Sequence, residues 1–125
     1  MKKDEKNSLC EDIAGNGCGL KKVLNIIGGK WKIMILCVID NNEVVRYGTL
    51  KRSVYKITNT MLSQSLKELE QDGLIVREED SEIPNKVVYY LTDIGCTLRP
   101  VIESMQKWGS EYKKYRKLLE KTKGE

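Results

Sequence analysis

The sequence predicts a single, mainly α-helical domain that carries a small β-hairpin and ends in a long helix. Apolar residues recur at helical spacing over most of segment 20–72. β-branched and aromatic residues form two short runs within segment 74–91, as in a hairpin. From Leu98 to Leu119, apolar residues alternate at spacings of three and four, as in a helix that packs along another helix. The 125 residues are enough for one such domain.

Composition and charge exclude several classes of protein. The chain is 40% hydrophobic and 32% charged, a balance typical of a soluble globular domain. It begins with a polar stretch and has no run of the roughly 20 apolar residues that a bilayer requires, so we expect a cytoplasmic protein with no membrane partner. The absence of histidine removes the commonest general base and the commonest metal ligand. We therefore expect neither an enzyme nor a metal or other cofactor.

Two helices are expected in the first third of the chain. Apolar residues on one face predict a helix over 20–27, and Gly28-Gly29 ends it because glycine adopts the left-handed cap conformation at little cost. Segment 30–39 is apolar at nearly every position and predicts a largely buried helix, with Trp31 in the core. Asp40-Asn41-Asn42 is a turn signal, so the second helix should end there.

Two further helices, over about 46–54 and about 58–72, are separated by only residues 55–57. So short a joint holds two helices at a steep angle, as in a helix-turn-helix. The inner stripe of the second helix is formed by Leu62, Leu66 and Leu69. Thr58 or Asn59 can cap its start, and Gly73 marks its end.

A hairpin and a closing helix complete the chain. Residues 74–77 and 87–91 predict two strands, and the polar residues between them predict a long projecting tip. Thr92-Asp93 caps the final helix, which Pro100 should bend near its start. The heptad seam of this helix predicts a dimer interface formed by Leu98, Val101, Met105, Trp108, Tyr112 and Tyr115.

These elements together describe a winged helix-turn-helix with a long C-terminal dimerisation helix. We expect a single domain over residues 1–125. It would comprise a flexible N-terminal arm over 1–17, a winged-helix core over 18–91 and a dimerisation helix over 92–120. Some winged helices bind DNA, whereas others bind proteins. The charge distribution helps to distinguish these two functions.

The formal net charge of +4 is unevenly distributed. Segment 20–56 holds eight Lys and Arg against two acidic residues, whereas segment 67–82 holds two against seven. A basic segment ahead of helix 58–72 suits contacts with phosphates, which supply affinity without sequence information. The acidic residues of the hairpin tip oppose DNA contact by the wing and are compatible with a protein partner instead.

The outer face of helix 58–72 begins with short hydroxyl and amide side chains, which can donate to and accept from base edges. Its acidic residues come later, away from the end that would enter the major groove. The sequence therefore predicts double-stranded DNA as the partner. The predicted DNA-binding residues lie on this face, in the basic segment before it and at the hairpin tip: Arg46, Lys51, Arg52, Thr58, Asn59, Thr60, Ser63, Gln64, Lys67, Asn85 and Lys86.

Several sequence blocks occur in an order and spacing that together are highly specific. They include Gly28-Gly29-Lys30-Trp31-Lys32, Arg46-Tyr47-Gly48-Thr49-Leu50-Lys51-Arg52, Met61-Leu62-Ser63-Gln64-Ser65-Leu66-Lys67-Glu68-Leu69-Glu70-Gln71-Asp72-Gly73-Leu74-Ile75, Tyr90-Leu91-Thr92-Asp93-Ile94-Gly95 and Trp108-Gly109. From about Cys18 to Tyr112, the chain resembles the HxlR-type bacterial transcription regulators, winged-helix relatives of the MarR proteins.

The resemblance implies a homodimer that binds a pseudo-palindromic operator through two recognition helices and regulates nearby genes. The closing helices, together with the N-terminal helix, would form the dimer. The chain departs from the family pattern at three positions: Gly19 follows Cys18 where Pro is usual, Tyr47 stands where Phe is common, and Asn85 stands where a second Pro is usual. The alternative function is a winged-helix protein–protein interaction module without specific DNA binding.

The resemblance also implies a sensor of oxidants or electrophiles at Cys18. Cys18 lies at the N-terminal edge of helix 20–27, and Lys21 and Lys22 follow within one turn, so the thiolate is favoured over the thiol. Oxidation could join Cys18 to Cys10 or to a cysteine of a second subunit. The alternative is that Cys18 is an unreactive packing residue.

The other cysteines carry weaker signals. Cys37 lies in the most apolar helix and is expected in the core, whereas the sequence predicts no role for Cys96. The four cysteines include no Cys-x-x-Cys pair, so a structural zinc site is not expected. No general base is available near a cysteine, so a thiol-dependent enzyme is disfavoured.

Overall fold

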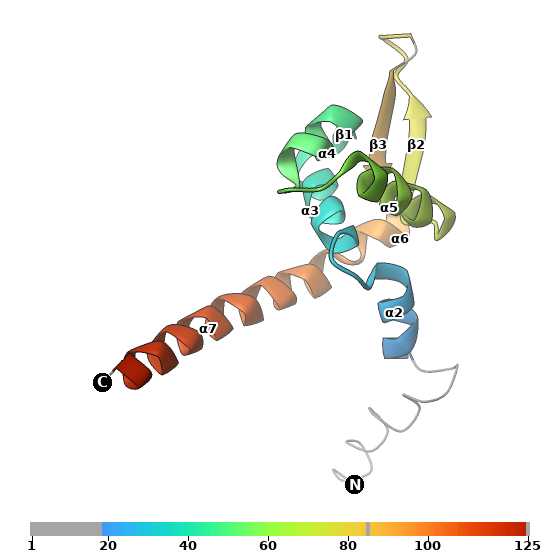
Figure 1. Cartoon of the computed structure of the whole chain (residues 1–125). Coiled ribbons are helices and arrows are strands. Elements are labelled where there is room, and N and C mark those ends of the chain that lie inside the picture. Colours follow the sequence, from blue (N-terminus) through green and yellow to red (C-terminus); the bar gives the residue numbers. More distant parts are fainter. Residues whose placement is uncertain (1–18, 85, 125) are drawn as a thin grey trace, which may run out of the picture.

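The computed structural model describes residues 19–84 and 86–124, and it confirms a mainly helical winged fold with a long C-terminal helix (Figure 1). The elements in chain order are α2 (Gly19–Ile27), α3 (Lys32–Asn42), β1 (Val44–Arg46), α4 (Tyr47–Ser53), α5 (Asn59–Gln71), β2 (Ile75–Glu79), β3 (Val87–Leu91), α6 (Asp93–Cys96) and α7 (Arg99–Gly124). The predicted N-terminal arm, 1–17, lies outside the described residues, as do Cys18 and Asn85.

The sheet has three antiparallel strands in the order β1-β3-β2. β2 and β3 form the predicted hairpin, with Arg77 opposite Tyr89. The sequence predicted only these two strands. The structure adds a third, because β1 pairs with the other side of β3 and places Val45 opposite Tyr89. Three residues are too few to show the alternation of a strand, so the sequence did not predict β1. The helix expected over about 46–54 is confirmed as α4, which begins at Tyr47.

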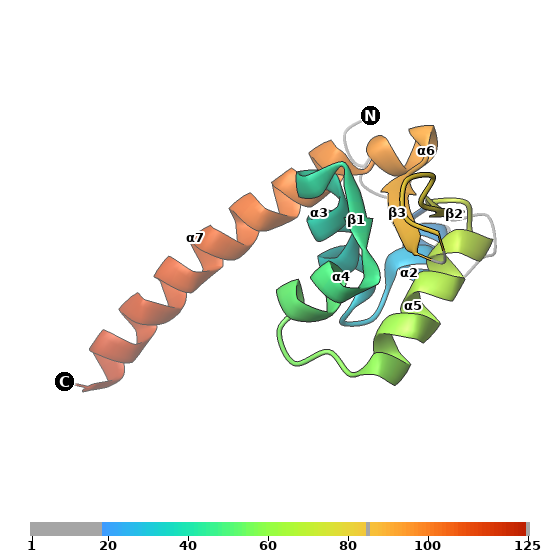
Figure 2. The same cartoon turned by 90° about the horizontal axis from the view of Figure 1, so that it is seen from above.

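The core lies where α3, α4 and α5 meet the sheet (Figures 1 and 2). The leucine stripe of α5, formed by Leu62, Leu66 and Leu69, is confirmed as buried. The buried residues of α3 in the same core are Ile35, Leu36 and Ile39. Burying one such side chain contributes roughly 1.5–3 kcal/mol. Trp31 does not lie inside this core as expected. It is half-buried at the margin, because it precedes the first turn of α3 rather than standing within the helix.

α3 runs two residues beyond the first residue of its predicted turn signal. The Asn42 side-chain amide donates to the carbonyl of Val38 at 2.7 Å and so satisfies an acceptor near the helix end. Glu43 then takes a positive φ of 63° with a ψ of −59°, which departs from helical geometry and ends the helix. Asp40 and the two asparagines after it therefore form the last turn of α3 rather than the loop that follows it.

The predicted closing helix is two helices. Thr92 caps α6, as predicted, and its hydroxyl accepts from the amide of Gly95 at 3.1 Å. An α-helix cannot continue beyond Cys96, because Pro100 has no N–H for the Cys96 carbonyl and its ring would clash there. α7 begins at Arg99, which places Pro100 in a first turn that needs no donor. The expected bend is thus a break before the proline.

α7 leaves the core and extends away from it (Figures 1 and 2). Leu98 and Ile102, at its start, pack against the core. From Glu103 to Leu118 every side chain is exposed. The apolar seam of α7 is therefore uncovered in the single chain. Within the described part of the chain, no helix is long and apolar enough to cross a membrane.

Gly95 allows α6 to pack closely against the backbone of Leu74, the residue before β2. A Cβ added there would lie 2.2 Å from the backbone oxygen of Leu74, so Gly95→Ala should force α6 away and destabilise the fold by about 1–3 kcal/mol. Gly109→Ala is the matched control, since no atom lies within 4 Å of the added Cβ, and it should stabilise α7 by up to about 1 kcal/mol. Urea unfolding at equal protein concentration measures both changes. Equal midpoints for the two variants would contradict the close approach.

Candidate nucleic-acid interface

The exposed face of α5 gathers five of the predicted DNA-binding side chains. They line one shallow hollow and are all exposed: Asn59, Thr60, Ser63, Gln64 and Lys67. Burial of the leucine stripe on the opposite face requires this orientation. Thr58 precedes them as the N-cap, and its hydroxyl accepts from the amide of Met61 at 3.1 Å. The predicted cap is confirmed, and it leaves the first turn of α5 open toward solvent.

A basic groove separates α4 from the hairpin. It has a volume of about 560 Å³ and is lined by Arg46, Tyr47, Gly48, Thr49, Arg52, Arg77, Lys86, Val87 and Tyr89. The cationic side chains come from β1, α4, β2 and the start of β3. Lys51, which was predicted beside Arg52, is half-buried on α4 and does not line this groove. The groove therefore brings together cations that are up to 40 residues apart in the sequence.

A second hollow joins the basic groove to α5. It has a volume of about 450 Å³ and includes Ser63 and Lys67 from α5, Tyr47 from α4, and Arg77 and Tyr89 from the hairpin. Since Tyr47, Arg77 and Tyr89 line both hollows, the polar face of α5 and the basic groove are one continuous surface. We call this surface the α5–wing surface.

Arg77 is an exposed member of the α5–wing surface that the sequence reasoning missed. The signal was present, because a strand beginning near residue 74 points alternate side chains to opposite faces. Leu74 and Ile75 are both buried, however, and the three residues from Arg77 to Glu79 are all exposed, so the burial pattern of β2 hides the alternation. Tyr47 was noted only as a departure from the usual Phe.

An ion pair ties β1 to the tip of the hairpin. The Arg46 guanidinium lies 2.6 Å from an Asp80 carboxylate oxygen. The backbone N–H of Glu82, and then Arg46, hold the pKa of Asp80 below its usual value. One of the acidic residues that opposed DNA contact by the wing is thereby paired within the protein. The same pair also engages Arg46, which the sequence had assigned to DNA.

Two hydrogen-bonded groups hold side chains of α5 in place. The Tyr47 hydroxyl lies 3.0 Å from Asn59 Oδ1 and 3.2 Å from Ser63 Oγ. Further along the helix, the Gln64 amide donates to Glu68, whose carboxylate also pairs with Lys32 of α3 at 2.7 Å. The bond from Gln64, followed by Lys32, lowers the pKa of Glu68. Three of the five outward side chains are thus restrained before any partner binds.

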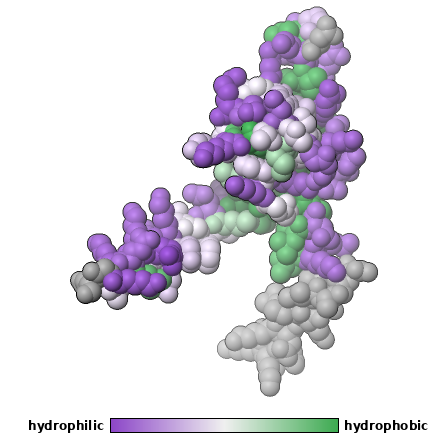
Figure 3. Space-filling view, viewed as in Figure 1, coloured by the Kyte–Doolittle hydropathy of each residue, from purple (hydrophilic) through white to green (hydrophobic). Residues whose placement is uncertain are grey.

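α7 and α2 present a separate, apolar surface. The predicted seam residues Val101, Met105, Trp108, Tyr112 and Tyr115 are 44–68% exposed, and the rings of Trp108 and Tyr112 stack with centroids 5.3 Å apart. Leu98 differs, because it is half-buried against the core of its own chain. On α2, three further apolar residues are exposed: Leu20, Val23 and Leu24. Figure 3 shows an apolar patch over α2, below the core.

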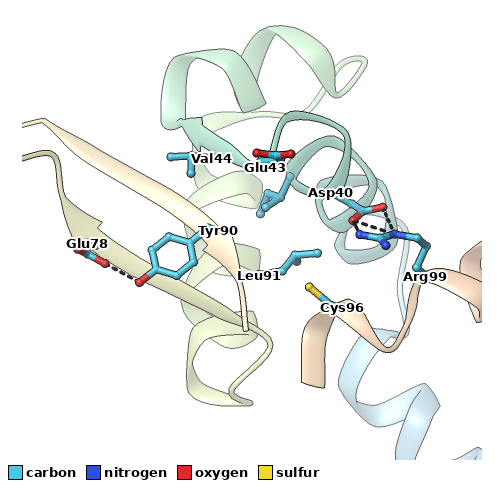
Figure 4. Close-up of a pocket in the computed structure, with 9 residues that line it drawn as sticks. Asp40, Glu43, Val44, Glu78, Tyr90, Leu91, Cys96 and Arg99 are labelled. Atoms are coloured by element: carbon cyan, nitrogen blue, oxygen red, sulfur yellow. Dashed lines mark hydrogen bonds and ion pairs between the residues drawn. The ribbon is translucent and has the colours of Figure 1, made fainter. Parts of the chain in front are cut away.

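The junction of α3 with α7 is held by an ion pair beside a pocket of about 480 Å³ (Figure 4). The Arg99 guanidinium donates to both carboxylate oxygens of Asp40, through Nε to Oδ2 at 3.0 Å and Nη2 to Oδ1. This hydrogen bonding lowers the pKa of Asp40. Across the pocket, the Tyr90 hydroxyl donates to Glu78. The ion pair between Arg99 and Asp40 thus joins the start of α7 to α3.

Two cysteines lie within the described residues, and one of them, Cys37, differs from expectation. Cys37 is half-buried rather than in the core, and burial, followed by the Asp40 charge, raises the pKa of its thiol. Cys96 is exposed in α6. Neither lies in the α5–wing surface. Among residues 19–84 and 86–124, no group of three or more Cys, Asp or Glu side chains could hold a metal ion.

Comparison with known proteins agrees with this geometry. Residues 26–117 match the model of the HxlR-like helix-turn-helix family. The chain belongs to this family. The HTH-type transcriptional regulator YdzF of Bacillus subtilis is 48% identical over 103 residues, which cover 82% of this chain and 92% of YdzF. The chain is therefore related to transcriptional regulators over most of its length, and the relatives named here are regulators rather than enzymes.

Solved structures extend the relationship of this HxlR-family protein to two further regulators. The redox regulator HypR in its oxidised form is 39% identical with a TM-score of 0.66, over 75% of this chain and 96% of HypR. The reduced form of the transcriptional regulator YodB from B. subtilis is 30% identical with a TM-score of 0.66, over 74% of this chain and 90% of YodB. The fold and the family are thus shared with a protein described as a redox regulator.

Proposed function

We propose that the chain is a homodimeric, sequence-specific regulator that binds double-stranded DNA. Membership of the HxlR-like family supports a transcriptional regulator, and the observation that supports DNA binding most directly is the continuous α5–wing surface. It combines side chains that can recognise bases with cations that can contact phosphates. A regulator of bacterial genes of this kind would act in the cytoplasm.

The start of α5 is suited to enter the major groove. Amide side chains such as Asn59 and Gln64 can hydrogen-bond to base edges, and Ser63 and Thr60 can bond to several bases. Lys67 adds a cation one turn further along the same face. The positive end of the helix dipole also favours phosphates near the first turn. We assign base recognition to this face of α5.

Phosphate contacts are assigned to the basic groove. Arg52, Arg77 and Lys86 line it, and the ion pair with Asp80 makes Arg46 a support for the wing as well. Lys51, on α4, would lie beside the DNA backbone when α5 docks. Asn85 lies outside the described residues and stays a prediction. Contacts of this kind give affinity that falls as the salt concentration rises.

Dimerisation is assigned to the apolar surface of α7 and α2. A seam of aromatic and aliphatic side chains that is about half exposed is unfavourable in water, and burying it against a second copy would remove that cost. A two-fold dimer presents two α5 helices to successive turns of the major groove, about 34 Å apart. The operator should therefore be pseudo-palindromic.

Redox control is assigned to Cys18, with Cys10 as a possible partner in oxidation. Support comes from the relationship with HypR, which is described as a redox regulator. Cys18 immediately precedes α2, where Lys22 is exposed in the first turn and favours the thiolate. Because α2 carries part of the apolar surface, a bond formed at its N-terminus would act on the dimer arrangement and hence on the spacing of the two α5 helices.

Sequence-specific binding is tested by selecting bound fragments from a random pool and measuring their affinity over a salt series. Arg52→Ala with Arg77→Ala should weaken binding to all fragments and reduce the slope of log affinity against log salt by about 2, because each arginine is assigned one phosphate contact. Lys121→Ala with Lys123→Ala, at the far end of α7, removes the same charge and should leave the slope unchanged. A wild-type ratio of specific to random affinity near one would overturn the function in favour of a protein-interaction module.

The dimer is tested by placing a charge on the seam. Trp108→Glu should shift the protein from twice the chain mass toward the monomer in light scattering, because a carboxylate would be buried between apolar side chains. Ser110→Glu adds the same charge to an exposed position outside the seam, and it should remain dimeric. A Trp108→Glu protein that stays dimeric would show that α7 is not the interface.

The sensor is tested by exposing the protein to diamide and measuring operator affinity. The affinity of the wild type should change by about tenfold or more and recover with dithiothreitol, whereas Cys18→Ser should not respond, because it lacks the reactive thiolate. Cys37→Ser is the control and should respond as the wild type does. An equal response of wild type and Cys18→Ser would exclude Cys18 as the sensor.

A further inference from the structure

The hydroxyl of Tyr47 joins the first helix of the helix-turn-helix to the outer face of the second. Tyr47 is the first residue of α4, and its ring packs against the core at the edge of the α5–wing surface. Its hydroxyl lies 3.0 Å from the side-chain oxygen of Asn59, 3.2 Å from the Asn59 carbonyl and 3.2 Å from Ser63 Oγ. A rigid aromatic side chain therefore holds an oxygen beside two outward residues of α5.

The chemistry of these contacts restricts what Asn59 can offer to a base. A phenol has one proton to donate, and the two oxygens of Asn59 can only accept, so the Tyr47 hydroxyl donates toward Asn59, with Oδ1 closer than the backbone carbonyl. With the phenol proton directed at Asn59, the Ser63 hydroxyl donates to the phenol oxygen. The Asn59 amide oxygen is then engaged within the protein, and its NH2 group remains for the exterior. Without the hydroxyl, the carboxamide could turn over and present its oxygen instead.

We infer that Tyr47 is a positioning residue that sets the sequence specificity of α5 through Asn59 and Ser63. It holds Asn59 as a hydrogen-bond donor, so the base facing Asn59 offers an acceptor in the major groove, as a purine N7, guanine O6 or thymine O4 does. A base edge that offers only a donor, such as cytosine N4, is excluded. This inference rests on the proposed DNA binding and adds to it the identity of the selected base edge.

Preorganisation is the physical basis of the effect. Asn59 and Ser63 are exposed, so in the absence of Tyr47 they would sample several rotamers and lose that freedom on binding DNA. Held side chains discriminate better between bases, because the wrong base edge then meets a donor that cannot turn away. The neighbouring Gln64 is restrained in the same way by Glu68, so the contact from Tyr47 extends an arrangement already present on α5.

The experiment compares Tyr47→Phe with wild type on the fragment that the wild type selects. Affinity is measured for that fragment and for its symmetric single-base variants at every half-site position. Tyr47→Phe should reduce discrimination at one position of each half-site by about threefold to tenfold, the value of one hydrogen bond. The salt dependence and the urea midpoint should be unchanged, because the ring and the phosphate contacts are kept.

Two further variants make the result specific to the hydroxyl and its partner. Tyr55→Phe removes the same atom from a tyrosine that is 78% exposed in the turn before α5, and it should retain the wild-type discrimination. Asn59→Ala should lose discrimination at the same position, and adding Tyr47→Phe to it should change little more. Such non-additivity is expected when one residue acts through the other.

The outcomes separate this inference from the proposed function. A wild type that prefers no sequence overturns the proposed DNA function itself. A wild type that prefers one sequence, with a Tyr47→Phe protein of unchanged discrimination at all positions, overturns the positioning role alone. Equal loss of affinity for all fragments, together with a lower urea midpoint, would assign the hydroxyl to fold stability and would also overturn the role.

Discussion

The burial of a single leucine stripe on α5 is the constraint on which the functional surface depends. Leu62, Leu66 and Leu69 pack into the core, and a helix that buries one face must expose the opposite one. Asn59 and Ser63 therefore point outward whatever their partners are. Loss of this packing would cost several kcal/mol and would also remove the recognition face, so stability and function share the same side chains.

Internal pairing determines which charges remain available at the surface. Asp80 and Glu68 each engage a basic side chain of the same chain, Arg46 and Lys32. Two acidic residues of segment 67–82 are thus neutralised within the chain, and one of them, Asp80, is paired with a residue that lines the basic groove. The formal charges of an acidic segment overstate its repulsion of DNA when the fold pairs some of its carboxylates with basic side chains. Which carboxylates are paired depends on the tertiary structure.

The direction of α7 determines where the apolar seam lies relative to the α5–wing surface. The break before Pro100 and the ion pair between Asp40 and Arg99 both lie at the point where α7 leaves the core. Because the seam begins directly after this junction, the junction would influence how far apart the two α5 helices lie in the proposed dimer. The proposed redox control at Cys18 would act on the same dimer through α2, the other exposed apolar helix.

Local periodicity determined a large part of this protein from sequence alone. The leucine stripe of α5, its Thr58 cap, the hairpin and the family resemblance follow from the order and spacing of neighbouring residues, and all of them are confirmed. The tertiary structure alone decided the pairing of β1 with β3, the basic groove that includes Arg77, and the contacts of Tyr47 with α5. Spacing along a chain records which face of an element is apolar, whereas contacts between residues 12 to 59 positions apart depend on how the elements pack, which no local pattern encodes.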